Sequence, residues 1–249
     1  MRERRFFVPD LLGGREIEIH DQEAHHLYHV LRLGPGDEIV VFDGKGRHFR
    51  AVITSANRHF AAVQQLEELP TSESSLELTL AVAVPKRGRM SSIIRMLTEL
   101  GVARITPLVT ERTLSASTAA LQEKCERWSR IALEACKQSG RSWIPVIDSP
   151  MSFCELSRIV LPENRILVSP RGAQALPIRP VSPCVVAIGP EGGWSEEEVS
   201  LASANGFQEL SLGPRTLRTE TAAVTVASIL QWEFGDLKGG RKKEGESRK

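Results

Sequence analysis

The chain has 249 residues, of which 41% are hydrophobic and 25% are charged, and its formal net charge is +1. This composition is typical of a globular protein, and runs such as 78–84 are far shorter than the ~20 apolar residues of a membrane helix, so disordered, fibrous and membrane-spanning chains are excluded. The near-neutral charge also excludes a polycation that binds nucleic acid without discrimination, so a nucleic-acid site must be local.

The chain starts with MRERRFFVPD, in which basic residues are followed by no long apolar stretch. A secretory signal is therefore not predicted, and we expect a cytoplasmic protein. Basic side chains joined to aromatic ones can neutralise phosphates and stack on bases, so Arg4, Arg5 and Phe7 are candidate RNA contacts. The alternative is a β-strand with a buried phenylalanine.

Residues 1–70 predict a small β-rich domain. Its strands are expected in three segments of alternating or turn-joined apolar residues: 15–20, 37–53 and 59–68. A short helix between Asp21 and Leu33 interrupts them, with Asp21 as its N-cap. The following segment 69–75 has the composition of a linker.

All six histidines lie in this first part of the chain, and Asp21, His25 and His29 recur at four-residue spacing. We nevertheless predict no metal site, because Asp21 is better used as an N-cap, no H-E-x-x-H motif occurs and no cysteine lies nearby. The alternative role for these polar residues is contact with RNA or with a partner subunit.

Residues 76–238 alternate strand and helix patterns, which predicts an α/β domain with a mainly parallel sheet. Strands are expected at 76–84, 104–109, 143–147, 165–169, 184–190 and 207–214, and helices at 90–100, 118–139, after Ser195 and from about Thr219. The four cysteines form no C-x-x-C pair and are predicted to be reduced thiols. Residues 239–249 have the composition of a disordered tail.

The stretch VVAIGPEGGWSEEEV predicts an apolar strand, a glycine loop and a helix that starts with a capping box of Ser195 and Glu198. Such loops at the carboxyl ends of parallel strands bind small molecules. Glu191 in the loop and the glutamates of the first helical turn would repel a phosphate, and the spacing fits neither G-x-G-x-x-G nor the P-loop. A neutral or cationic ligand is therefore favoured, the alternative being a tight, well-capped turn.

The stretch LGPRTLRTETAA follows the predicted strand 207–214, which we place beside the 184–190 strand in the sheet. Arg215 and Arg218 supply permanent, forked donors there. Glu220 and Thr221 stand where the next helix exposes its first N–H groups. The alternative is that Thr219 caps this helix and Glu220 forms a surface ion pair with an arginine.

Two further basic stretches are candidate RNA contacts. Lys86, Arg87 and Arg89 lie between a strand and a helix, hence at the sheet edge that carries the ligand loops. Gln138 and Arg141 follow an amphipathic helix, where they contact RNA or a partner subunit, or simply end the helix.

Several long motifs occur in one order: KRGRM, LTELGVARITPLVTER, IALEACKQSGR, IGPEGGWSEEE and LGPRTLRTETAA. Together they resemble the RsmE family of ribosomal RNA methyltransferases, within the SPOUT class. The resemblance extends from RRFFV near the start to about residue 237. It implies an α/β methyltransferase domain with a trefoil knot, preceded by a PUA-like, RNA-binding β-barrel, and a chain that works as a homodimer.

The resemblance further implies an S-adenosylmethionine-dependent enzyme that methylates N3 of a uridine in 16S ribosomal RNA, within the small ribosomal subunit. Its cofactor loops would contain Val168, Ser169, Gly189, Glu191, Gly192, Gly193, Leu212, Gly213, Leu217 and Arg218. The cofactor carries a sulfonium cation and no phosphate, which agrees with the acidic loop.

Methylation of uracil N3 requires loss of its proton and stabilisation of negative charge on O2 and O4. Arg218 is the first candidate for that stabilisation and Arg215 the second. Glu220 either accepts the proton or orients an arginine. Two other functions stay open: a non-catalytic RNA-binding or ribosome-assembly factor, and methylation of another base or of a ribose hydroxyl.

Overall fold

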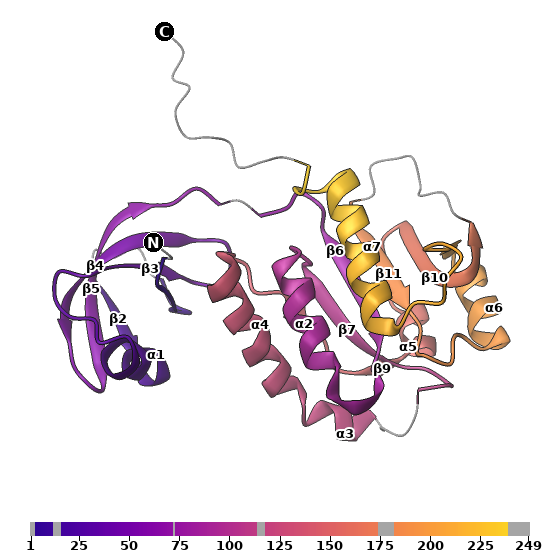
Figure 1. Ribbon diagram of the computed structural model, residues 1–249, viewed down its shortest axis with the longest axis horizontal. Coiled ribbons are helices and arrows are strands. Elements are labelled where there is room, and N and C mark those ends of the chain that lie inside the picture. The colour runs from indigo at the N-terminus through magenta and orange to yellow at the C-terminus, as the bar shows by residue number, and fades with distance from the viewer. Residues whose placement is uncertain (1–2, 12–15, 72, 114–117, 174–181, 239–249) are drawn as a thin grey trace, which may run out of the picture. The chain divides into compact units, whose positions relative to one another are not determined.

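The structure, a computed structural model, describes residues 3–11, 16–71, 73–113, 118–173 and 182–238. The predicted tail 239–249 and most of the proline-rich segment after residue 173 lie outside the described residues. The chain divides into two compact units: Met1–Glu73 with Ala132–Ile144, and Ser74–Ile131 with Pro145–Lys249 (Figure 1). Residues 132–144 therefore belong to the first unit, an addition that the sequence did not predict.

The first unit contains a five-stranded sheet in the order β1-β3-β4-β5-β2. The strands are β1 (Arg5–Phe7), β2 (Glu16–His20), β3 (Glu38–Phe42), β4 (His48–Ala56) and β5 (Phe60–Glu68). Apolar residues alternate along β2 and β5, and their buried members form one core. The three predicted strand segments are confirmed, and Arg5–Phe7 is a strand with Phe6 buried.

The predicted short helix is present as α1 (Asp21–His25), which continues as a π-helical turn, η1 (His26–Val30). The prediction that Asp21 is its N-cap is wrong, because His20 occupies that position. An N-cap residue has extended backbone, which His20 adopts at φ −118° and ψ 173°. Asp21 instead has φ +53°, a left-handed conformation that aspartate tolerates better than most residues.

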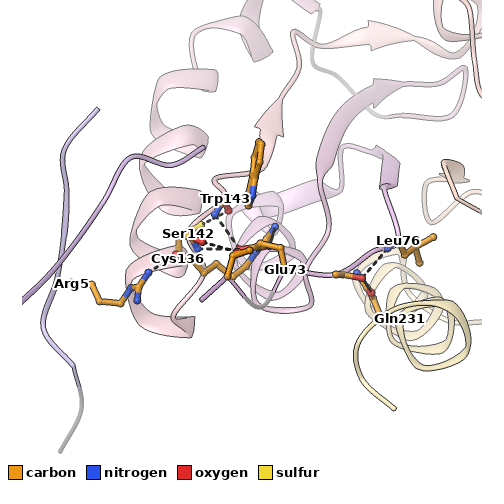
Figure 2. Close-up of polar contacts among 10 residues, drawn as sticks. Arg5, Glu73, Leu76, Cys136, Ser142, Trp143 and Gln231 are labelled. Atoms are coloured by element: carbon orange, nitrogen blue, oxygen red, sulfur yellow. Dashed lines mark hydrogen bonds and ion pairs between the residues drawn. The ribbon is translucent and has the colours of Figure 1, made fainter. Parts of the chain in front are cut away.

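Glu73 joins the segment 141–144 to the rest of the first unit. Its Oε1 accepts hydrogen bonds from the backbone N–H groups of Ser142 and Trp143, both at 3.1 Å. Its Oε2 accepts from Nε of Arg141 at 3.0 Å, and the Arg141 carbonyl accepts from Nη2 of Arg5 at 3.2 Å (Figure 2). Charge-assisted bonds of this kind explain why residues 132–144 group with the first unit.

The second unit contains a parallel sheet in the order β12-β10-β11-β6-β7-β8, with β9 paired to β7. Its strands are β6 (Leu78–Ala83), β7 (Arg104–Val109), β8 (Val146–Ile147), β9 (Met151–Ser152), β10 (Asn164–Ala173), β11 (Cys184–Ile188) and β12 (Gln208–Leu210). The predicted parallel α/β architecture is confirmed. The predicted place of the last strand is wrong, because β12 pairs with β10 and not with β11.

Helices cover both faces of this sheet. The helices of the second unit are α2 (Met90–Glu99), α3 (Thr118–Gln122), α5 (Phe153–Arg158), α6 (Glu196–Ala204) and α7 (Thr219–Phe234), with a 3₁₀ turn, η2 (Lys86–Gly88). Helix α4 (Cys125–Ser139) begins in the second unit and ends in the first. Helices α2 and α7 lie side by side, and α7 contacts β6 and β11 (Figure 1). Helices α5 and α6 pack with the alternate side chains Val185 and Ala187 of β11, hence on the other face.

Two details of the helices differ from the sequence prediction. The single helix expected over 118–139 is divided into α3 and α4. Helix α5 was not predicted, although Ser152 and Glu155 form a capping box at its start. Within the described part of the chain, every helix is too short or too polar to cross a membrane.

The reactivity of the cysteine thiols is expected to follow their burial. All four are free thiols, and burial raises the pKa values of Cys136 and Cys184 to about 12. At pH 8 only about one ten-thousandth of either thiol is ionised. We expect iodoacetamide to label Cys154, which is half-buried, well before Cys136 or Cys184 in the native protein, as measured by peptide mass spectrometry. Equal labelling rates in native and urea-unfolded protein would contradict this protection.

Candidate functional site

The segment 168–170 within β10 and the loops that follow β11 and β12 meet at one edge of the parallel sheet. Val168 of β10 pairs with Ile188, the last residue of β11, and with Leu210, the last residue of β12, so β11 and β12 end at the level of Val168. The prediction that the two glycine-bearing loops share this edge is confirmed. The order of the strands differs, because β10 lies between the other two.

A pocket with about 600 Å³ of empty space, part of it open to solvent, lies among these loops. Several predicted cofactor residues line it: Val168, Ser169, Gly189, Glu191, Gly193, Leu212, Gly213 and Leu217. Gly192 and Arg218 adjoin this lining in sequence and are not part of it. The sequence reasoning missed other lining residues of the same loops, which neighbouring positions could have suggested: Pro170, Ile188, Pro190, Trp194, Ser211, Thr216, Thr219 and Ala222.

Trp194 and Thr219 join the loop after β11 to β10 and to α7. The Trp194 ring packs so close to Gly189 that a Cβ there would lie 3.0 Å from the indole. Nε1 of Trp194 donates to the Val168 carbonyl at 2.9 Å, and Oγ1 of Thr219 donates to the Gly189 carbonyl at 3.0 Å. Thr219 therefore connects α7 to the β11 loop, whereas the N-cap of α7 is Arg218 and not Thr219.

The capping box of Ser195 and Glu198 at the start of α6 is confirmed. Glu198 has a second function, since its Oε1 accepts the backbone N–H of Glu111 at 3.0 Å. In the same turn after β7, Nη1 of Arg112 donates to the Gly192 carbonyl at 3.0 Å. The turn at 110–113 thus braces the Gly192 loop, and Arg112 is a site residue that the sequence reasoning missed because the contact spans 80 residues.

We expect Arg112→Ala to weaken the binding of a ligand in this pocket about tenfold, because a charge-assisted hydrogen bond to the loop is lost. Arg112→Lys should weaken it less, since the ammonium still donates a hydrogen bond. Calorimetric titration of the ligand checks both values, with Arg95→Ala on the exposed face of α2 as the control. Equal affinity of wild type and Arg112→Ala would show that the loop holds its shape without this side chain.

Glu220 is paired with an arginine, as one alternative predicted, and that arginine is Arg89. Nη1 of Arg89 lies 2.9 Å from Oε1 of Glu220. The other oxygen, Oε2, is buried with no hydrogen-bond partner among the described residues. Arg215 lines the pocket, and both Arg215 and Arg218 are exposed. The two candidate arginines are thus available to a ligand, while Arg89 is engaged within the protein.

The predicted RNA-contact residues differ in how far their side chains are exposed to solvent. The Arg5 side chain is 4% exposed and the Arg141 side chain 10%, and both are held in the network around Glu73. Phe7 is half-buried, with its ring centroid 5.7 Å from that of Phe42. Burial therefore makes Arg5 and Arg141 structural residues of the first unit. The exposed candidates are Arg4, Lys86 and Gln138, and the Arg87 side chain lies outside the described part of the chain.

The histidine cluster forms a separate, open depression in the first unit. It is lined by Asp21, His25 and His29 together with Gln22, Arg58 and His59. Among the described residues no group of three or more His, Cys, Asp or Glu side chains is arranged to bind a metal ion.

Comparison with known proteins identifies relatives over almost the whole chain. An RNA methyltransferase domain family matches residues 72–231, and an RNA methyltransferase PUA domain family matches residues 19–66. The ribosomal RNA small subunit methyltransferase E of Synechocystis is 38% identical over 92% of this chain and 77% of its own length. The protein of the same name from Aquifex aeolicus is 32% identical over 90% of this chain and 97% of its own length.

Two solved structures share this architecture. A ribosomal RNA small subunit methyltransferase E from Neisseria gonorrhoeae, bound to S-adenosylmethionine, superposes with a TM-score of 0.86 at 35% identity, over 94% of this chain and 99% of that one. A methyltransferase from Legionella pneumophila with bound cofactor reaches 0.87 at 35% identity, over 95% of this chain and all of that one. The PUA-like unit followed by an α/β methyltransferase domain, as the resemblance implied, is confirmed.

Proposed function

Because this chain belongs to the ribosomal RNA small subunit methyltransferase E family, we propose that it transfers the methyl group of S-adenosylmethionine to N3 of a uridine in 16S ribosomal RNA. The observation that carries the proposal is the pocket beside β10 and at the ends of β11 and β12, in which predicted cofactor residues from three separate segments come together.

The chemistry of the pocket fits S-adenosylmethionine. Its lining combines glycine backbone, apolar side chains such as Leu212 and Leu217, one carboxylate, Glu191, and one guanidinium, Arg215. The apolar side chains accept an adenine ring, and in the glycine loop Glu191 attracts a sulfonium cation and repels the phosphates of a dinucleotide. When bound, S-adenosylmethionine supplies an electrophilic methyl group, and the loops fix its position relative to the base.

Side chains around the pocket provide what the uridine requires. Arg218 is our first candidate and Arg215 our second for stabilising negative charge on uracil O2 and O4 as N3 loses its proton. Glu220 is the candidate acceptor of that proton or, through its ion pair with Arg89, a residue that positions the first turn of α7. The N3–H bond breaks, the N3–methyl bond forms, and the sulfur keeps the electron pair of its former bond.

The remaining expectations from the family form part of the proposal. The second unit carries a trefoil knot, the chain is a cytoplasmic homodimer, and the 16S ribosomal RNA is modified within the small subunit. Exposed Arg4, Lys86 and Gln138 stay candidate RNA contacts, with Arg87 and Arg89 beside Lys86. Sedimentation of the purified protein tests the dimer.

The deciding experiment maps the methyl group. Small subunits from a strain that lacks the enzyme are incubated with the protein and labelled S-adenosylmethionine, and the 16S RNA is digested and analysed by mass spectrometry. We expect N3-methyluridine at one position. Methylation of a ribose or of another base would show that uridine N3 is not the substrate atom. Binding of the RNA without methyl transfer would favour a function as a non-catalytic ribosome-assembly factor.

A further inference from the structure

The turn between β3 and β4 and the segment 142–144 together form one exposed surface of the first unit. Lys45 pairs with Trp143 in an antiparallel bridge. The bridge is extended by hydrogen bonds from the Gly46 N–H to the Ser142 carbonyl at 3.1 Å and from the Ile144 N–H to the Gly44 carbonyl at 3.0 Å. Directly opposed residues of an antiparallel pair project to the same face, so the side chains of Lys45 and Trp143 lie on one face.

The indole of Trp143 is held in place and yet exposed. Trp143 is 48% exposed, and its side chain points away from the Glu73 carboxylate (Figure 2). The ring packs against Gly46, where a Cβ would lie 2.3 Å from Nε1, and Gly46 has φ +105°. Only glycine combines this backbone with this close approach. The exposed ring is thus already ordered, so little conformational entropy would be lost when a flat partner stacks on it.

The charge around this ring is positive. Lys45 and Arg47 are exposed on the same turn. The nearby acidic groups are used inside the protein, because Oδ1 of Asp43 accepts the N–H groups of Lys45 at 2.7 Å and Arg47 at 3.0 Å, and Asp43 is 7% exposed. Both oxygens of Glu73 are likewise occupied by donors from 141–143.

We propose that the surface of Lys45, Gly46, Arg47 and Trp143 binds single-stranded RNA, with Trp143 stacking on a base and the two cations contacting phosphates. An ordered aromatic ring on the same turn as exposed cations is suited to unpaired nucleotides, since every base has a π-face and every linkage a negative charge. One exposed indole offers far less area than a stable protein interface needs. The proposal rests on the proposed function. It names residues of the first unit that bind the RNA in addition to the methyl-transfer pocket of the second unit.

The test uses the full-length protein and a fluorescein-labelled single-stranded RNA octamer of mixed sequence, with binding followed by anisotropy. We expect Trp143→Ala to weaken binding about tenfold or more, because one base stack is lost, and Trp143→Phe to stay within about threefold of wild type. Leu66→Ala removes another exposed apolar side chain of the same unit and should leave binding unchanged. On 16S ribosomal RNA, Trp143→Ala should raise KM and leave kcat unchanged.

The cations are tested by salt dependence, which does not depend on how well the Trp143 variants fold. Replacing Lys45 and Arg47 together with glutamine should lower the slope of log K against log salt by about 1.4, or about 0.7 for each lost phosphate contact. An unchanged slope, or unchanged octamer affinity of folded Trp143→Ala, overturns the proposal. So does a Trp143→Ala protein that loses only self-association in sedimentation, because the surface would then be a protein interface.

The proposed function can fail separately. If the wild-type protein leaves 16S ribosomal RNA unmethylated, the proposed function is wrong, and the octamer affinities still decide whether this surface binds RNA. If the wild type methylates and Trp143→Ala binds the octamer as wild type does, only the surface is wrong.

Discussion

Replacing Arg218 with alanine is expected to lower kcat for methyl transfer by ~10²–10³-fold, the cost of removing one preorganised donor from a developing anion. Arg218 is exposed at the N-cap of α7, between Leu217 and Thr219, which both line the pocket. Since Arg218 itself is not in the lining, the affinity for S-adenosylmethionine should stay within about threefold of wild type. The measurements are single-turnover methylation of 16S ribosomal RNA and calorimetric titration of the cofactor.

Two further variants test whether the effect of Arg218→Ala is specific to the guanidinium group at this position. Arg218→Lys keeps the charge and loses the forked geometry, so it should recover part of the rate. Arg95→Ala removes an exposed arginine from α2 of the same unit and should leave the rate unchanged. A wild-type single-turnover rate for Arg218→Ala would exclude this residue as the charge stabiliser and move the assignment to Arg215.

The Gly172→Ala variant is expected to lose about 2–3 kcal/mol of unfolding free energy, because the added methyl group overpacks a backbone contact that cannot relax easily. A Cβ at Gly172 would lie 2.6 Å from three backbone atoms of Glu209 and Leu210. Strand β10 is irregular here, since Val168 and Ala173 both pair with Leu210. Gly172 therefore lets β12 approach the segment that carries Ser169 and the wall of the pocket.

Urea unfolding measures the effect of Gly172→Ala, and calorimetry follows the accompanying loss of cofactor affinity. Gly34→Ala is the control, because a Cβ at Gly34 meets no atom within 4 Å. Its unfolding free energy should change by no more than about 0.5 kcal/mol. Equal stability of the two variants would show that β12 can move away from β10 at little cost.

Much of the site was predictable because its signals are local. The loop around Gly189, the capping box of Ser195 and Glu198, and the turn before α7 each lie within one short stretch of sequence. Parallel strands bring the ends of such stretches to one edge, so the meeting of the loops followed from the alternation of strands and helices. The acidic character of the first loop likewise favoured a neutral or cationic ligand over a phosphate.

The contacts that join distant segments were not predictable in this way. The ion pair of Arg89 with Glu220 spans 131 residues, and the bond from Arg112 to Gly192 spans 80. The sequence predicted that Arg5 and Arg141 contact RNA. In the structure both side chains are largely buried and interact with other residues of the first unit. A basic residue has the same local pattern whether it faces solvent or a buried carboxylate, so only its tertiary neighbours distinguish the two.

The sequence by itself determined the class of the fold, most strands and helices, the glycine-bearing loops and the sign of the charge that the pocket accepts, because periodicity, capping and loop chemistry act over a few residues. Only the tertiary structure decided that β12 lies beside β10, that residues 132–144 belong with the first unit, and that Trp143, rather than Arg5 or Arg141, is presented to solvent. These outcomes depend on which distant segments pack against one another. The free energy of that packing is a property of the whole chain, so no short stretch of sequence determines it.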